Sequence, residues 1–553
     1  MSEGWLHPAW PCLAAAAVAG LTPGPLRRAL LLAGPALALG LAWVLPDGAR
    51  ATTALMGVEL TWLRVDRLGR LFALVFALIG ALAALYGWTA SRRFHVTALG
   101  ATGAALALVL AGDWLTLYLW WEALALASFV LIGDGEAPRA AAAAFRYLLV
   151  HVAGGACLLA GIAWHLATGG GLVLDRLAVE GPGLLVLLAF AVNAAVPPLH
   201  AWLTDAYPES SPAGSALLSA FVTKSAVYAL ARVFPGTEGL VWAGVAMTLY
   251  GVTFAVLEND LRRLLGYHIV SQVGYMVTGV GLGTPLGVSG AVAHAFCHIL
   301  YKGLLFMGAG AVVTATGRRR LSELGGLGRR LPATAVLYMV GALSISGAPL
   351  LNGFVSKTLV VAAAGEAGWP IARLLLLLAA VGTFLSVGLK LPWFTFAGTD
   401  RRLDPTPVPR TMVAAMTLAA VLCFLTGTWP GLLYALLPYP VDVVPYSADH
   451  VLEALQLLTG TAVAFALLRP RLQPKAAVTL DFDRVYRALG RLVGEGLAPA
   501  VGRSADGLEA VVTRLADRPL GTLPARLAGP VGYAVVAAMV ALGLALLFLD
   551  PPR

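Results

Sequence analysis

Three basic side chains, His294, His298 and Lys302, lie four residues apart in one apolar stretch. The stretch, AVAHAFCHILYKGLLFMGAGAVV, is long enough to cross a lipid bilayer as a helix. On a helix the three groups form one stripe, about 6 Å apart along the axis by the ~1.5 Å rise per residue. Because an ionisable group at bilayer depth costs roughly 2.5–3.5 kcal/mol on insertion scales, the stripe should face protein or water. Waters can bridge such gaps, so the pattern predicts part of a proton or ion pathway.

Further ionisable side chains inside apolar stretches are candidates for the same pathway. Glu122 lies among tryptophans and leucines in LTLYLWWEALALASF, where a carboxylate needs a proton or a basic partner, and a plain salt bridge between helices is the simpler alternative. Lys224 lies in SALLSAFVTKSAVYALAR, and Lys357 lies in GFVSKTLVV. For Lys390, near the end of a later apolar stretch, extension of the ammonium to the membrane surface explains the residue equally well.

Other titratable residues carry weaker signals. The lone histidine His151 is more typical of a satisfied core residue than of a relay, and the same holds for His200 and His268 near expected helix ends. Asp205, Glu258, Asp260, Arg262 and Arg263 lie close to loops, where ion pairing and topology explain them.

The composition is that of a polytopic membrane protein. Of 553 residues, 59% are hydrophobic and 12% charged, and the mean hydropathy is +0.81. Apolar stretches indicate about sixteen membrane-spanning helices. The net charge of +9 does not indicate a nucleic-acid partner, because the arginines lie in short loops and every second loop is basic. By the positive-inside rule these loops are cytoplasmic, which places both termini outside.

The organisation along the chain predicts two similar blocks. Each block contains one apolar stretch interrupted by proline and small residues, at Val196–Pro197–Pro198 and at Ser346–Gly347–Ala348–Pro349. Paired broken helices are typical of inverted-repeat transporters, whose ions bind near the midplane. The expected segments are N-terminal transmembrane helices (1–96), a first half-channel (97–233), a second half-channel (239–397), C-terminal transmembrane helices (398–475), an amphipathic surface helix (476–528) and a final transmembrane anchor (529–553).

No cofactor is expected in this chain. Cys12, Cys157, Cys297 and Cys423 stand singly, so the sequence indicates neither an iron–sulfur cluster nor a disulfide framework, and no metal site is expected. It contains no nucleotide-binding glycine motif. We therefore expect no covalent chemistry here, and any redox or ATP chemistry would belong to partner subunits.

Several longer motifs resemble one family, the antiporter-like subunits of respiratory complex I, of Mrp-type cation/proton antiporters and of membrane-bound hydrogenases. The resemblance covers essentially the whole chain. Its motifs are WWEALALASF, VPPLHAWLTDAYPESSPAGSALLSAFVTKSAVYALAR, ENDLRRLLGYHIVSQVGYM, HAFCHILYKGLLFMGAG, and ELGGLGRRLP followed by SISGAPLLNGFVSK. YHIVSQVGYM and HILYKGLLFM are most similar to the MrpD-type branch of the antiporters. The amphipathic segment with a final span is similar to the long subunits of complex I and hydrogenases.

The resemblance implies an all-α fold of two inverted five-helix repeats, each a half-channel, joined by a hydrated axis of charged residues. It implies that Glu122 is the carboxylate of the first half, Lys302 the central lysine with His298 beside it, and Lys357 the terminal lysine of the broken helix. Lys224 matches a lysine of the MrpD-type branch. The expected proton path therefore consists of Glu122, Lys224, His298, Lys302, Lys357 and Lys390, with His294 next to it and Pro197 and Pro349 marking the breaks.

Asn193 departs from the family pattern. The family has a lysine just before the first break, which pairs with the glutamate, whereas this chain reads NAAVPPLH from Asn193. An amide carries no charge, although it can hydrogen-bond water. Either Lys224 pairs with Glu122 instead, or the first half-channel works differently or not at all.

Our leading hypothesis is a proton-translocating component of a multi-subunit complex in a bacterial inner membrane. Its partners would be other integral membrane subunits, and Na⁺ would be the exchanged ion in an Mrp-type assembly. The alternatives are a proton-pumping component of a redox complex of the NADH:quinone oxidoreductase or hydrogenase type, a stand-alone secondary solute transporter, a proton-conducting component of an inorganic-carbon accumulating complex, and a scaffold protein.

Overall fold

The computed structural model describes residues 6–55, 57–135 and 137–475, with single residues 481, 482, 484, 485 and 488. The amphipathic segment predicted at 476–528 falls almost entirely outside these described residues, and the anchor predicted at 529–553 falls entirely outside them. All helices named below belong to one compact unit, Met1–Ala51 with Thr61–Thr479. The hairpin tip Thr52–Leu60 belongs to a second unit.

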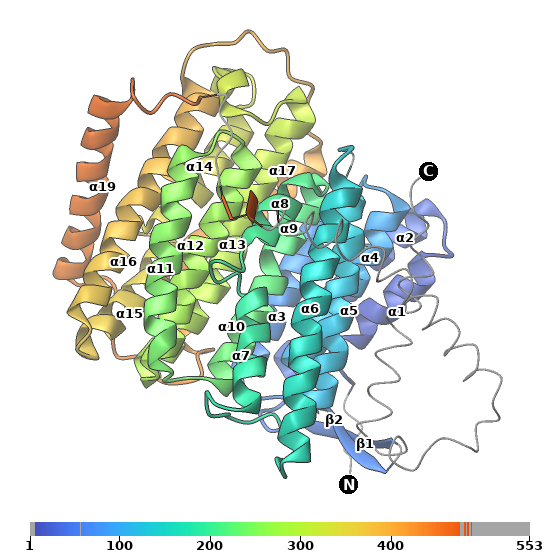
Figure 1. Cartoon of the computed structure of the whole chain (residues 1–553). Coiled ribbons are helices and arrows are strands. Elements are labelled where there is room, and N and C mark those ends of the chain that lie inside the picture. The colour runs from blue at the N-terminus through green and yellow to red at the C-terminus, as the bar shows by residue number, and fades with distance from the viewer. Residues whose placement is uncertain are drawn as a thin grey trace. The chain divides into compact units, whose positions relative to one another are not determined.

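Helices dominate the described chain, and they run side by side in Figure 1. The first elements are α1 (Trp10–Ala19), α2 (Gly24–Val44), β1 (Arg50–Leu55), β2 (Val58–Arg64), α3 (Arg67–Tyr86), α4 (Arg92–Val109), α5 (Trp114–Gly133) and α6 (Ala140–Ala167). The middle elements are α7 (Pro182–Asn193), α8 (Ala201–Ala206), the 3-10 turn η1 (Tyr207–Glu209), α9 (Pro212–Ala220), α10 (Val222–Val233), α11 (Glu238–Leu257), α12 (Leu261–Leu282) and α13 (Pro285–Thr316). The last are the 3-10 turns η2 (Leu321–Glu323) and η3 (Leu327–Arg329), α14 (Pro332–Ser346), α15 (Asn352–Glu366), α16 (Pro370–Thr383), the π-helical turns η4 (Phe384–Lys390) and η5 (Trp393–Ala397), α17 (Arg410–Thr428), α18 (Pro430–Tyr434) and α19 (Ala448–Leu468).

The expected polytopic helical fold is confirmed. Ten helices of the described chain are long and apolar enough to cross a membrane. The number sixteen stays a prediction, because several expected spans consist of shorter helices in series. One element was not expected, a two-stranded sheet of β1 and β2. The β-branched residues of RATTAL and VELTWLR favour strands, and Gly57, with φ of 80°, supplies the left-handed turn between them.

Side-chain caps explain where many helices begin. The first amides of a helix have no partner inside it, so a carboxylate or hydroxyl just before the helix stabilises that end. Asp66 accepts a hydrogen bond from the amide of Gly69 at 2.8 Å, and Asp113 accepts one from the amide of Thr116 at 2.8 Å. Short polar residues between apolar stretches therefore set the helix ends.

Both expected breaks are present, and the structure adds further irregularities. The segment between α7 and α8 contains Pro197, and the segment between α14 and α15 contains Gly347 (φ 79°) and Pro349. Figure 1 shows α14 above α15. A third interruption, at Phe221 between α9 and α10, was not foreseen because that stretch has no proline or glycine near it. The π-helical turns after α16 were not foreseen either.

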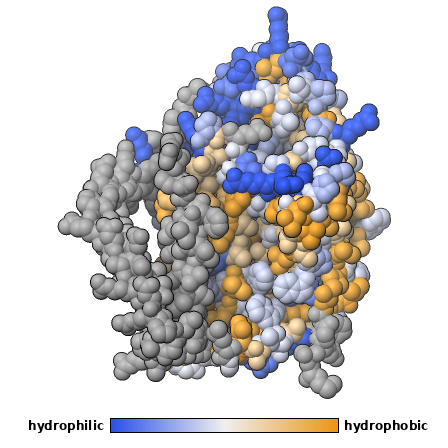
Figure 2. Space-filling model, turned by 90° about the vertical axis from the view of Figure 1, so that its right-hand side faces the viewer, coloured by the Kyte–Doolittle hydropathy of each residue, from blue (hydrophilic) through white to orange (hydrophobic). Residues whose placement is uncertain are grey.

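The helix with the basic stripe lies at the centre of the bundle. In the most apolar window of α13, 94% of residues are buried, against 11% in that of α19. α13 packs against α12, α15, α9, α14, α17 and α3. On the face shown in Figure 2, hydrophobic residues cover much of the middle, and hydrophilic residues gather at the upper end. A peripheral α19 and a central α13 place the stripe far from lipid.

The pair α11 and α12 packs through glycines and small polar residues. An added Cβ atom at Gly251 would lie 2.6 Å from the backbone nitrogen of Ser271 and 2.6 Å from the carbonyl oxygen of Tyr267. One at Gly274 would lie 2.5 Å from the carbonyl oxygen of Gly244. Small residues permit such backbone approach between membrane helices, so this contact holds α12, which carries His268, close to α11.

We predict that Gly251→Ala destabilises the protein by about 1–3 kcal/mol, because the added methyl group would press on backbone atoms that cannot rotate away. The measurement is the midpoint of thermal unfolding in detergent. The control is Gly460→Ala in α19, where an added Cβ atom meets no atom within 4 Å, and it should be neutral or slightly stabilising. Equal midpoints for the two variants would contradict the close packing.

Candidate functional site

The basic stripe of α13 is completely buried. His294, His298 and Lys302 each have 0% exposure. The rings of His294 and His298 lie 6.4 Å apart between centroids, and the ring of Tyr301 lies 5.2 Å from that of His298. The structure therefore brings the three predicted residues into one internal column.

His294 connects the column to α12 and α15. Its Nδ1 lies 3.0 Å from Oγ of Ser356, and its Nε2 lies 3.4 Å from the hydroxyl of Tyr301. Tyr301 in turn donates to Oε1 of Gln272 at 3.4 Å. Hydroxyl groups both donate and accept, so Ser356 and Tyr301 extend a polar chain away from the histidine.

Several buried polar atoms of this region have no hydrogen-bond partner within the described residues. They are Glu122 Oε1, Asn193 Oδ1, His268 Nδ1, both ring nitrogens of His298, Lys302 Nζ and Asn352 Nδ2. The Lys302 ammonium lies 5.8 Å above the ring of Phe306. Buried polar groups are almost always satisfied by protein or by ordered water. The arrangement therefore fits a column that water completes.

Lys357 occupies the second helix break. Its Nζ donates to the carbonyl oxygen of Ile345 at 2.6 Å, in the last turn of α14, and lies 5.1 Å above the ring of Tyr275. Helix ends leave carbonyl groups without partners in the helix, and these attract a cation. The interruption between α14 and α15 thus supplies the acceptor for the lysine.

Lys224 has the same kind of contact in the first half. Its Nζ donates to the carbonyl oxygen of Ser219 at 2.7 Å, in the last turn of α9, and to Oγ1 of Thr223 at 2.9 Å. The unforeseen interruption at Phe221 makes this carbonyl available. Lys224 is 0% exposed.

Glu122 packs against a glycine pair of α6. An added Cβ atom at Gly155 would overlap Oε1 of Glu122, and one at Gly154 would lie 4.0 Å from Oδ1 of Asn193. Gly155 therefore leaves the space that the Glu122 carboxylate uses, and Asn193 lies at ordinary contact distance from the neighbouring Gly154. In the described part of the chain no salt bridge joins Glu122 to Lys224. The first alternative for Asn193, direct pairing of Lys224 with Glu122, is thus not seen here.

Lys390 is buried against the end of α11. It is 3% exposed, and its Nζ donates to the carbonyl oxygens of Val256 at 2.5 Å and Glu258 at 2.8 Å, at the end of α11. One helical turn earlier, Oγ of Ser386 lies 2.7 Å from Nε2 of His268. The π-helical turn η4 carries both residues, and π-helical turns occur often at functional sites.

Of the loop-proximal charges, Asp205, Glu258, Asp260 and Arg263 form ion pairs, as the sequence pattern predicts. Arg146 pairs with Asp205 at 2.6 Å, and Arg319 pairs with Asp260 at 2.6 Å and with Glu209 at 2.9 Å. These contacts tie the loops together and need no transport role.

Sequence reasoning missed the residues that connect or accommodate the titratable groups. Ser356, Ser386 and Gln272 are common polar residues whose spacing carries no signal. Only the dipeptide Gly154–Gly155 in HVAGGACLL could have been noticed in the sequence. Adjacent glycines inside an apolar helix often mark the close approach of another backbone or side chain. Among the described residues, no three His, Cys, Asp or Glu side chains gather as a metal site would require.

Comparisons with known proteins found one family model and many similar proteins. The family model described as NADH:quinone oxidoreductase/Mrp antiporter, transmembrane, matches residues 111–386. An uncharacterized protein of Methanocaldococcus jannaschii is 31% identical over 59% of this chain and 72% of its own length. The D-type component of the Na(+)/H(+) antiporter of Bacillus subtilis is 28% identical over 66% of this chain and 79% of its own length.

Other relatives are matched over a smaller part, and the match spans 41% of the length of a probable A/B-type component of a K(+)/H(+) antiporter of Rhizobium meliloti. Among solved structures, a chain of the Mrp complex from Dietzia sp. DQ12-45-1b superposes with a TM-score of 0.71 at 27% identity, over 84% of this chain and 98% of that one.

We predict that Asn193→Lys is accepted when Glu122 is present and is destabilising when Glu122 is replaced by Gln. Both side chains face the Gly154–Gly155 pair, so the added ammonium would lie near the unpartnered carboxylate oxygen. A double-mutant cycle on thermal unfolding should give a coupling of about 0.5–3 kcal/mol. A coupling of zero would mean that position 193 and Glu122 do not share one site.

Proposed function

Because the chain belongs to the NADH:quinone oxidoreductase/Mrp antiporter family, we propose that it conducts protons across a membrane as one component of a multi-subunit complex. The observation that carries the proposal is Lys302, a fully buried lysine whose Nζ has no hydrogen-bond partner among the described residues. A permanently charged ammonium group is costly in a buried site without a partner. A lysine that releases and regains its proton is charged for only part of the time.

The use of lysine in the whole chain supports the same function. Lysine and arginine together number 38, and the lysines are the five residues Lys224, Lys302, Lys357, Lys390 and Lys475. The first four are buried among the helices, whereas the basic loops use arginine. Arginine stays protonated in proteins, and buried lysine exchanges its proton readily. Lysine thus occurs mainly where exchange is useful.

The proposed path follows the buried groups through the bundle. Glu122 and Lys224 belong to the first half, Lys302 with His298 to the centre, and His294 with Ser356 connects the centre to the helix that carries Lys357. The helix α10, which carries Lys224, packs against α13, which carries Lys302. Two buried ammonium groups repel each other, so a proton arriving on one lysine favours release from the next. Lys390, the last lysine of the expected path, donates to carbonyl oxygens at the end of α11.

In this proposal the chain holds no cofactor, and the driving energy comes from partner subunits or from an exchanged cation such as Na⁺. We place it in the inner membrane of a bacterium, in keeping with the Gly-, Ala- and Arg-rich composition and with relatives such as the Bacillus subtilis antiporter component. Affinity purification from native membranes with mass spectrometry distinguishes the assemblies. Small hydrophobic antiporter subunits alone indicate an Mrp-type complex, and iron–sulfur partners indicate a redox-driven one.

We predict that Lys302→Arg lowers proton flux in reconstituted vesicles at least tenfold although the positive charge is kept, because guanidinium does not release its proton. Lys302→Ala should be equally inactive. The matched control is Lys475→Arg, since Lys475 is exposed at the end of the described helices and should conduct normally. Native gels establish that each complex is assembled. Wild-type flux in both Lys302 variants would leave a scaffold role as the explanation.

A further inference from the structure

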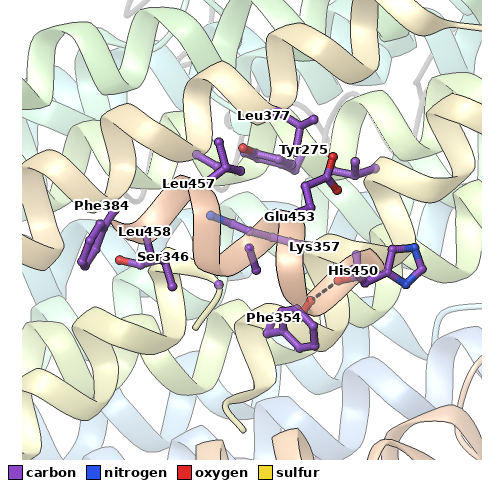
Figure 3. A pocket seen from close by; sticks show the side chains of 15 residues that line it. Tyr275, Ser346, Phe354, Lys357, Leu377, Phe384, His450, Glu453, Leu457 and Leu458 are labelled. Carbon is purple, nitrogen blue, oxygen red and sulfur yellow. Dashed lines mark hydrogen bonds between the residues drawn. The ribbon is translucent and has the colours of Figure 1, made fainter. Parts of the chain in front are cut away.

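A cavity of about 60 Å³ lies beside Lys357, between α12, α14, α15, α16, η4 and α19. Its lining includes Tyr275, Ser346, Lys357, Phe384, Glu453 and Leu457. Figure 3 shows the side chains of Tyr275, Lys357 and Glu453 gathered around it. On this measure one water needs roughly 10–15 Å³, so the cavity has room for a few waters.

Lys357 differs from the other lysines of the path in its exposure. Lys224 and Lys302 are 0% exposed, whereas Lys357 is 6% exposed and lines the cavity. The path thus reaches an accessible space at Lys357.

Glu453 lies at the opposite wall of the same cavity, on the peripheral helix α19. Its carboxylate pairs with Arg373 of α16 at 2.6 Å, and the two side chains are 29% and 42% exposed. Glu453 lies in the second turn of an apolar helix, where a carboxylate is unfavourable unless it faces a polar space. The cavity and Arg373 together supply that space.

The expected topology places this pair on the side opposite to the basic loops. α16 begins at Pro370 and α19 begins at Ala448, and both beginnings belong to loops that the positive-inside rule assigns to the non-cytoplasmic side. Arg373 and Glu453 each lie within two turns of those beginnings. They therefore stand between Lys357 and the non-cytoplasmic surface.

We propose that Glu453, held by Arg373, is the gate through which Lys357 exchanges protons with the non-cytoplasmic side. This inference rests on the proposed function. The N–H bond of the Lys357 ammonium breaks as an O–H bond forms on the Glu453 carboxylate through cavity waters, which leaves both groups neutral. Protonation removes the charge that holds Glu453 to Arg373, so the pair separates, and the carboxyl group releases its proton outward and pairs again.

The first test is proton flux through the reconstituted complex. Glu453→Gln keeps the shape of the side chain and its ability to accept from Arg373 but removes the titratable group, and flux should fall at least tenfold. Glu453→Asp should recover part of the flux. The matched control is Glu366→Gln, an exposed carboxylate at the end of α15, which should conduct at the wild-type rate.

The second test measures access to the cavity. Ala454 lines it, so Ala454→Cys, in a chain whose four cysteines are replaced by serine, should react with a membrane-impermeant methanethiosulfonate added from the non-cytoplasmic side and not from the cytoplasmic side. The modification should lower flux. If Glu453→Gln loses flux but the Ala454→Cys variant is not labelled from the non-cytoplasmic side, Glu453 has a structural role and the gate is overturned.

Failure of the gate is distinguishable from failure of proton conduction. Normal flux in both Lys302→Arg and Lys302→Ala overturns proton conduction by this chain. Loss of flux in Lys302→Arg together with wild-type flux in Glu453→Gln overturns the gate alone.

Discussion

The cost of holding an ammonium group inside an apolar bundle governs the architecture of this protein. A charge removed from water must be matched by an opposite charge, by backbone dipoles or by retained water, or else the group must release its proton. The described chain pairs its arginines with carboxylates near the loops, as in Arg319 with Asp260 and Glu209. Its buried lysines have no carboxylate partner in an ion pair among the described residues, and most of them lie at helix ends or helix interruptions instead.

Three buried lysines share one solution. Lys224 donates to Ser219, Lys357 to Ile345, and Lys390 to Val256, and each acceptor is a carbonyl oxygen in the last turn of a preceding helix. A helix end supplies unpaired carbonyls and the negative end of the helix dipole, which stabilise a cation without committing a full negative charge. Helix ends, two of them at the interruptions after α9 and α14 and one at the end of α11, thus supply acceptors for three of the buried lysines.

Lys302 has no such acceptor, because α13 is continuous from Pro285 to Thr316. Its Nζ and both ring nitrogens of His298 are left without partners in the described residues. The contrast assigns different parts to the lysines. Those at helix ends have a backbone carbonyl to receive the ammonium group, whereas the central lysine depends on water and on the charge of its neighbours, which suits a group that passes protons between two halves.

The sequence alone determined much of the fold. Hydropathy over long windows is a local property, so the helices α5 and α6 and the stripe of α13 were located to within a few residues. Proline and glycine act on their own backbone, so the breaks at Pro197 and Pro349 were predictable as well. The family motifs placed Glu122, Lys302 and Lys357, which are recognised by their type and neighbours in the chain.

The tertiary structure decided what those residues touch. The interruption at Phe221 has no proline or glycine to mark it in the sequence. In the folded chain it accompanies the hydrogen bond from Lys224 to the carbonyl oxygen of Ser219. The burial of Lys390, the contact of His268 with Ser386 across 118 positions, and the meeting of Lys357 and Glu453 at one cavity join residues far apart in the chain. Burial and hydrogen bonding depend on which helices pack together, and the pattern within one helix does not contain that information.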